Sequence, residues 1–206
     1  FPAVMPLVCS VVLVCLLLAS PGFAQQQWRP VFEGGKWDPE TSGSTGPNTS
    51  SEATEEGLRI ADLSTEQGSM RIYTLPWHAV PAQGACVEAR VRAVSCSMPW
   101  GMGIMVADGV HEECFTLFPD RVLLANAKLS APFDASGALH TYRIEVRDAD
   151  IRVFADDVLL IDGTGKFTHP SIAATPRNQV TFGAMASAAT GEAIWQWVKY
   201  RSSKPA

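Results

Sequence analysis

The feature that most constrains the fold of this chain is a set of short segments in which apolar and polar residues alternate. In Ala85–Cys96, valine and alanine alternate with glutamate and arginine, and His140–Arg147 follows the same pattern. Successive side chains of an extended strand point to opposite faces, so this period of two predicts strands with one buried and one solvated face. No segment has the 3.6-residue period typical of an amphipathic helix.

Residues that favour tight turns separate these segments. Asp108-Gly109 follows a uniformly apolar segment that we expect to be an inner strand, and Asp148–Asp150 and Asp156-Asp157 divide a three-stranded meander. About eleven strands are expected, at residues 58–62, 70–74, 85–96, 100–107, 114–118, 121–125, 140–147, 151–155, 158–161, 179–185 and 193–201. Short strands at regular spacing predict an all-β sandwich or barrel.

Residues 41–57 lack this alternation. Ser, Thr, Gly and Pro are frequent in the segment, and it contains no apolar residue larger than Ala. This composition predicts a flexible loop. Asn48-Thr49-Ser50 within it is a glycosylation sequon, which matters only in a host that glycosylates secreted proteins.

The N-terminal segment predicts secretion. Leu7–Ala19 is a largely apolar run of 13 residues, which matches a signal-peptide core and is shorter than the roughly 20 residues that span a bilayer. Ser20–Gly22 interrupts the run, and Gly22 and Ala24 are small residues suited to a cleavage site. We therefore expect a signal peptide at residues 1–24, a secreted or periplasmic protein, and no membrane span after cleavage. An uncleaved anchor is the alternative.

The remaining chain has the size of one domain. Removing 24 residues from 206 leaves 182, and we expect residues 25–206 to form a single sandwich. The net charge is −5, and Lys and Arg are not clustered. This charge distribution argues against nucleic acid and against an anionic membrane surface as partners.

Three cysteines remain after the expected cleavage. Cys86 and Cys96 would lie at the two ends of one extended strand, too far apart for a disulfide. Cys114 should therefore be one partner, and we favour Cys96–Cys114 because a tight hairpin separates the two residues. Three buried free thiols are the alternative.

The last third of the chain carries a family resemblance. The segments HTYRIEVRDADIRVFADDVLLIDG and VTFGAMASAATGEAIWQWVKY resemble the concanavalin A-like lectin/glucanase superfamily, especially the laminin-G-like jelly rolls of secreted bacterial proteins. The matching residues are His140-Thr141-Tyr142-Arg143, Asp156-Asp157, Phe182-Gly183, Trp195, Val198 and Tyr200. The resemblance implies a two-sheet antiparallel jelly-roll sandwich. It does not fix the function, because the superfamily includes lectins, glycosidases, receptors and adhesion modules.

The sequence lacks the motifs of a hydrolase. Glucanases of this superfamily place catalytic carboxylates on one strand as Glu-x-Asp-x-Glu, and no such string occurs here. Glu112 and Glu113 are adjacent, so on a strand they would face opposite sides. A Gly-x-Ser-x-Gly motif is also missing. We therefore expect a protein that is not an enzyme.

Calcium is the one cofactor that the resemblance suggests. Laminin-G-like domains often bind Ca²⁺ near one rim through an aspartate and backbone carbonyls. Asp108, Asp120 and Asp134 are the candidates, because they lie in expected loops. His111–Cys114 contains zinc-ligand residue types, but no second His/Cys cluster would complete four ligands.

The tryptophans give the best indication of a ligand. Flat aromatic rings bury the apolar C–H faces of sugars, and arginines donate hydrogen bonds to hydroxyls or carboxylates. Trp195 and Trp197 lie two residues apart, which predicts that they share one face of the last strand. The candidate binding residues are Trp195, Trp197, Trp77, Trp100, Arg90 and Arg92.

These observations predict a secreted, non-catalytic, lectin-like module whose partner is a carbohydrate. The first alternative is a protein-interaction or adhesion module of the same fold, binding an extracellular protein. A glycoside hydrolase with unrecognised catalytic residues is the second alternative.

Overall fold

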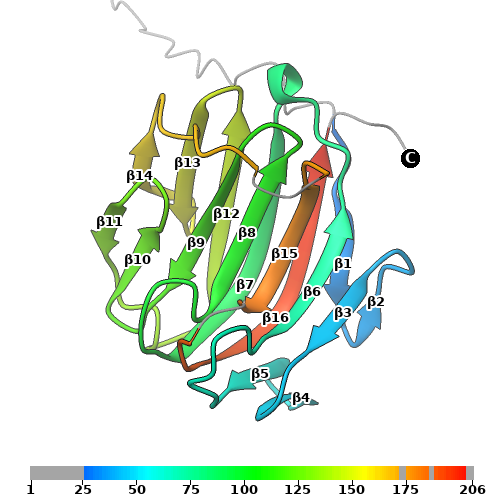
Figure 1. Ribbon diagram of the computed structural model, residues 1–206, viewed down its shortest axis with the longest axis vertical. Helices are drawn as coiled ribbons and strands as arrows, with labels where there is room; N and C mark the ends of the chain where they lie inside the picture. The colour runs from blue at the N-terminus through cyan, green and yellow to red at the C-terminus, as the bar shows by residue number, and fades with distance from the viewer. Residues whose placement is uncertain (1–25, 172–174, 186–187, 203–206) are drawn as a thin grey trace, which may run out of the picture.

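The computed structural model describes residues 26–171, 175–185 and 188–202. Two antiparallel sheets pack face to face, as the alternation predicted, and one 3₁₀ turn, η1 (Pro81–Gln83), is added (Figure 1). The predicted signal peptide at residues 1–24 lies outside the described residues. Within the described ranges, no helix has the length and apolar character needed to span a membrane.

The first sheet, sheet A, has nine strands. It contains β1 (Arg29–Glu33), β2 (Lys36–Trp37), β4 (Thr49–Ala53), β5 (Leu58–Asp62), β7 (Ala85–Cys96), β12 (His140–Arg147), β13 (Asp150–Ala155), β14 (Val158–Gly163) and β16 (Gly191–Ser202). Its main order is β14-β13-β12-β7-β16-β1-β2, and β4 joins through β5. The expected meander is therefore confirmed as β12, β13 and β14, joined by turns in which Asp148, Asp156 and Asp157 have positive φ.

The second sheet, sheet B, has seven strands. It contains β3 (Ser42–Thr45), β6 (Arg71–Pro76), β8 (Gly103–Asp108), β9 (Glu112–Leu117), β10 (Arg121–Leu124), β11 (Leu129–Pro132) and β15 (Asn178–Ala184). Their order is β11-β10-β9-β8-β15-β6-β3, and this sheet is nearer the viewer in Figure 1.

The two sheets bury one continuous core. On β7, Val87, Ala89 and Val91 are fully buried against sheet B, while Glu88 and Arg90 lie on the outer face. The period-two pattern thus separates the two faces of sheet A as expected.

Sheet B differs because its central strands are buried on both faces. Every residue of β8 and β9 is buried, which confirms the inner strand expected for the uniformly apolar segment. On the outer face, Met105, Cys114 and Met185 form a second small apolar cluster, with Trp100 packed against it.

Two expectations about strands need correction. The described residues form sixteen strands rather than eleven, because β1, β2, β3, β4 and β11 were not expected. Residues 41–57 are not simply a loop, since they contain β3 and β4. These two strands lie at sheet edges and pair through backbone groups, and most of their side chains are exposed. An exposed edge strand needs no apolar face, so its sequence shows no alternation.

Candidate functional site

A cavity opens where two hairpins meet the same edge of β16. β5 pairs with β16 along Gly191–Trp195, and β1 pairs with it along Trp197–Tyr200, so Gln196 lies between the two pairings. The cavity has a volume of about 400 Å³. We call it the edge notch, and it is lined by Phe32, Glu33, Gly34, Gly35, Trp37, Ala53, Thr54, Glu55, Glu56, Gly57, Leu58, Gln196 and Trp197.

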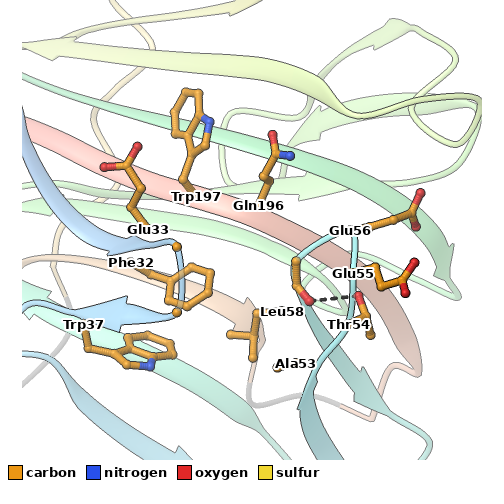
Figure 2. A pocket seen from close by; sticks show the side chains of 13 residues that line it. Phe32, Glu33, Trp37, Ala53, Thr54, Glu55, Glu56, Leu58, Gln196 and Trp197 are labelled. Carbon is orange, nitrogen blue, oxygen red and sulfur yellow. Dashed lines mark hydrogen bonds between the residues drawn. The ribbon is translucent and has the colours of Figure 1, made fainter.

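The β4–β5 turn packs directly against the backbone of β16. Gly57 has a φ of +147°, and a Cβ there would lie 2.4 Å from the carbonyl oxygen of Trp195. Only glycine permits that approach. The carbonyl of Gly57 accepts hydrogen bonds from the amide of Thr54 at 2.7 Å and from its Oγ1 at 2.9 Å. The turn, shown with its Thr54 hydrogen bond in Figure 2, therefore holds one side of the notch in a defined position.

Aromatic rings line the opposite side, which the β1–β2 hairpin provides (Figure 2). The Phe32 and Trp37 ring centroids are 4.7 Å apart, and Trp37 also packs on Tyr73 at 4.3 Å. Phe32 is nearly buried, whereas Trp37 remains 36% exposed. Trp37 is therefore a ring that the core holds in place and that still presents surface to a ligand.

Polar side chains complete the notch. Glu55 and Glu56 come from the β4–β5 turn, Glu33 from the end of β1, and Gln196 from β16 (Figure 2). Arg92 pairs with Glu56 at 2.5 Å. Glu33 and Glu55 make no ion pair and accept no hydrogen bond within the described part of the chain. The notch thus combines aromatic surface with solvent-exposed carboxylates that no other side chain pairs with in the described part of the chain.

The predicted pair of tryptophans does not share a face, so that expectation was wrong. The β7–β16 register shifts between Trp195 and Trp197, because a bulge places Gln196 out of the pairing. Trp195 is fully buried and packs on Phe182 at 5.0 Å, whereas Trp197 turns outward and lines the edge notch. Of the two, only Trp197 can meet a ligand at the notch.

The other two candidate tryptophans lie elsewhere. Trp77 is 1% exposed, and its Nε1 donates to the carbonyl of Ala107 at 2.8 Å, so it belongs to the core rather than to a rim. Trp100 packs on the small cluster outside sheet B, and its backbone amide donates to Thr116 Oγ1. Neither residue lines the edge notch.

The two candidate arginines share the outer face of β7. Arg90 donates to Thr141 Oγ1 at 3.3 Å on the neighbouring β12. Arg92 contacts the notch indirectly, through its ion pair with Glu56. The arginines are therefore supporting residues in this structure, and only Arg92 reaches the site.

A second pocket contains two of the three calcium candidates. We call it the rim pocket; its volume is about 570 Å³, and Pro119, Asp120, Pro132, Phe133, Asp134 and Ser136 line it. Asp134 Oδ1 accepts hydrogen bonds from the amides of Ser136 and Gly137 and from Ser136 Oγ. These backbone and hydroxyl donors lower the pKa of Asp134.

The candidate aspartates do not form one metal site. Asp108 lies apart from the rim pocket, and its Oδ1 accepts the amides of Val110 and His111. Asp120 pairs with Arg121 at 3.0 Å, and Asp134 is bonded within its own loop. Among the described residues, no three His, Cys, Asp or Glu side chains gather closely enough to hold a metal ion. The three candidate aspartates are therefore not brought together in one cluster, and calcium binding by a single aspartate with backbone carbonyls stays a prediction.

Cys86, Cys96 and Cys114 are free thiols in the structure, and the Cys96–Cys114 pairing stays a prediction. Cys96 ends β7 in sheet A, while Cys114 lies on the outer face of β9 in sheet B. Cys86 and Cys114 are buried, and burial raises the pKa of both thiols. Neither cysteine is part of the edge notch.

The adjacent glutamates of β9 face opposite ways, as expected. Glu112 lies outside sheet B, where Arg177 pairs with it at 3.2 Å and Ser171 donates to it. Glu113 accepts backbone hydrogen bonds, including two from Asn126 and Ala127. Burial raises its pKa even though these bonds oppose the shift. The two carboxylates are structural and cannot act as a catalytic pair.

Several residues of the edge notch were not recognised in the sequence. Phe32, Trp37, Glu33 and Glu55 lie in segments that the alternation did not assign to strands. A local signal exists, because Gly34-Gly35 is a turn dipeptide between two aromatic residues, as in a short hairpin. That signal predicts the hairpin but not what it packs against.

Comparison with known proteins supports the fold. No protein-family model matches the chain, and no curated protein sequence matches it. Crh5 transglycosylase in complex with NAG aligns over 89% of this chain and 86% of that chain, with 10% identity and a TM-score of 0.58.

Two further solved structures also align. The carbohydrate recognition domain of Emp46p, in its potassium-bound form, covers 81% of this chain and 90% of its own, with 12% identity and a TM-score of 0.51. Domain 4 of AbnA, an extracellular arabinanase from Geobacillus stearothermophilus, in complex with arabinotriose, covers 79% and 81%, with 11% identity and a TM-score of 0.50. The chain therefore has the concanavalin A-like lectin/glucanase fold, which serves both binding modules and enzymes.

Proposed function

We propose that this protein is a secreted, non-catalytic module that binds carbohydrate in the edge notch. The observation that carries the proposal is the exposed part of Trp37, which Phe32 and Tyr73 hold in a pocket whose border carries the exposed carboxylates of Glu33 and Glu55. A sugar ring can stack its C–H face on the indole, and further sugar units of a longer ligand can donate hydroxyl hydrogen bonds to the polar side chains at the border of the notch. The volume of about 400 Å³ falls within the range of small-molecule sites.

The arrangement of carboxylates supports a binding role over hydrolysis. On the outer face of sheet B, Glu112 is held by Arg177 and Ser171, and its strand neighbours on that face are Cys114 and Thr116. A glycosidase needs a second carboxylate at a defined distance from the first. This arrangement on the outer face of sheet B supports our proposal of a binding role rather than the chemistry of the enzymes that share the fold.

The test is a binding screen of the purified protein against soluble oligosaccharides and insoluble polysaccharides, repeated with Trp37→Ala. We expect at least one carbohydrate to bind, and Trp37→Ala to weaken that binding roughly tenfold. Trp100→Ala serves as the matched control, because Trp100 packs against the small cluster outside sheet B, away from the notch, and its loss should leave affinity unchanged.

Three results would contradict the proposal. Absence of binding to every carbohydrate would leave an extracellular protein as the expected partner. Binding that Trp100→Ala abolishes and Trp37→Ala spares would move the site to the outer face of sheet B. Release of reducing ends from a bound oligosaccharide, lost in Glu33→Gln or Glu55→Gln, would show that the notch is catalytic.

A further inference from the structure

One residue of β5 departs from the separation of apolar and polar residues. Leu58, Ile60 and Asp62 occupy alternate positions of the strand, so they share the face that turns into the sandwich. Leu58 and Ile60 belong to the apolar core, whereas Asp62 carries a carboxylate and is 0% exposed. A charged side chain at a position where the pattern favours an apolar one is expected at a functional or strained site.

The carboxylate of Asp62 is only half satisfied. Its Oδ1 accepts hydrogen bonds from the amide of Ser64 at 2.8 Å and from Ser69 Oγ at 3.2 Å. Its Oδ2 is buried and has no hydrogen-bond partner among the described residues. Within the same ranges, no lysine, arginine or histidine forms an ion pair with Asp62. A buried carboxylate without a counter-charge is costly, so this position favours a bound cation.

The oxygens around Asp62 outnumber the protons that they can share. Ser69 Oγ lies 3.1 Å from the Pro47 carbonyl oxygen and 3.2 Å from Asp62 Oδ1, but a hydroxyl has one proton to donate. A water molecule could donate to Asp62 Oδ2, but it would leave the buried charge uncompensated. Carboxylate, carbonyl and hydroxyl oxygens in this proportion are the ligands of a hard cation.

Three segments meet at this cluster, at the end of the sandwich where β4 and β5 lie (Figure 1). Asp62 ends β5, Ser69 comes from the β5–β6 connection, and Pro47 comes from the β3–β4 turn. The amide of Gly46 donates to the carbonyl of Met70 at 2.6 Å, which joins the turn to the connection. A Cβ at Gly46 would lie 2.8 Å from the Met70 amide nitrogen and 3.2 Å from Ser69 Oγ, so this contact requires glycine. Close backbone packing therefore positions the three oxygen-bearing residues.

We propose that Asp62 Oδ2, the Ser69 hydroxyl and the Pro47 carbonyl bind one calcium ion. Calcium accepts about six to eight oxygen ligands in adaptable geometry, whereas magnesium requires a compact octahedron and gives up its waters reluctantly. Pro47 and residues 65–68 are exposed, so water can reach the cluster and complete the coordination. The site needs no group of carboxylates, because two of its three protein ligands are neutral oxygens. It uses none of the three aspartates that the family resemblance suggested, and it is independent of the carbohydrate-binding proposal.

The first measurement is calcium binding to the intact protein, after treatment with a chelator and removal of that chelator. Titration calorimetry should detect one calcium ion per chain, with a Kd between about 10⁻⁴ and 10⁻³ M, as in extracellular calcium modules. At about 10 mM calcium the unfolding temperature should rise by about 5 °C, because the ion binds only the folded chain. Magnesium at the same concentration, and sodium at equal ionic strength, should give less than about half of that rise.

Asp62→Asn separates cation binding from a structural role of the carboxylate. The amide oxygen can still accept from the Ser64 amide, but the charge is removed, so calcium should no longer raise the unfolding temperature. Without calcium, Asp62→Asn should unfold at the same temperature as the unchanged protein or higher, because it removes an uncompensated buried charge. A carboxylate with a purely structural role would instead lower the unfolding temperature equally with and without calcium. Asp134→Asn is the matched control, since it makes the same change in the rim pocket and should keep the full calcium response.

Ser69→Ala tests the neutral ligands and decides the matter if Asp62→Asn does not fold. It should weaken calcium binding severalfold, and unchanged calcium affinity would overturn the proposed ligand set. The proposal is also wrong if calcium neither binds nor stabilises the intact protein, or if sodium alone gives the full stabilisation. Loss of the calcium response in Asp134→Asn, with the response kept in Asp62→Asn, would place the ion in the rim pocket instead.

Discussion

The edge notch and the rim pocket contain similar residue types but use them differently. Each has an aromatic ring and carboxylates at its border. In the rim pocket, Asp134 is bonded by its own loop and Asp120 by Arg121. In the edge notch, Glu33 and Glu55 project from two separate hairpins and remain unpaired among the described residues. A carboxylate that already accepts hydrogen bonds from its own loop stabilises the fold, whereas an unpaired carboxylate is available to a ligand.

The largest expected difference between the two pockets concerns their glycines. Gly57→Ala would place a Cβ 2.4 Å from the Trp195 carbonyl oxygen at a φ of +147°. The backbones of Gly57 and Trp195 are both held by hydrogen-bonded pairing. We expect the substitution to lower the free energy of unfolding by about 3 kcal/mol, because neither side can move cheaply. Chemical denaturation measures the change.

Gly137→Ala, at the residue that follows Ser136 of the rim pocket, is the matched comparison. Its Cβ would lie 2.6 Å from Asp134 Oδ2, the tip of an exposed side chain that can rotate away. We expect a cost of about 1 kcal/mol or less. If Gly57→Ala and Gly137→Ala lowered stability equally, the backbone contact at Gly57 would be no tighter than the contact at Gly137.

The next difference concerns ligand affinity. Trp37→Ala should weaken carbohydrate binding roughly tenfold, or about 1.4 kcal/mol, by removing the stacking surface. Phe133→Ala removes the ring of the rim pocket, where the carboxylates are already bonded, and should leave affinity within about twofold. Titration calorimetry on both variants measures this, with circular dichroism to confirm folding. A larger loss in Phe133→Ala would reverse the assignment of the site.

The sequence predicted the sheets far better than it predicted the site. β7 and β12 were recognised because one face of each is buried, and burial imposes alternation on the sequence. β3 and β4 were missed because both faces of an edge strand can be polar. The notch was missed for a different reason, since residues 32–37, 53–58 and 196–197 meet only through the pairing of β16 with two hairpins.

The bulge in β16 left a trace in the sequence that could have been used. The buried residues Ala193 and Trp195 have odd numbers, while Val198 and Tyr200 have even numbers. A strand without a bulge keeps its buried residues two apart, so the change of parity predicts one extra residue between them. Trp197 has an odd number, like Ala193 and Trp195. The sequence alone therefore predicted that Trp197 and Trp195 would share one face of the strand.

The smallest expected difference appears in the pH dependence of stability. Backbone bonds from Gly137 and Ser136 hold the pKa of Asp134 below its usual value of 3.8 in the folded protein. The charged form is therefore favoured by folding, so its contribution is present above pH 3.8 and is lost as the pH falls through the lower folded value. Asp134→Asn should lower the unfolding temperature slightly at neutral pH, and the difference from the unchanged protein should vanish in strong acid. Glu55→Gln removes a notch carboxylate without such bonds, and we expect no change in unfolding temperature at neutral pH. Thermal denaturation of both variants across the acid range decides whether the rim pocket uses its carboxylate for stability while the edge notch keeps its own for a ligand.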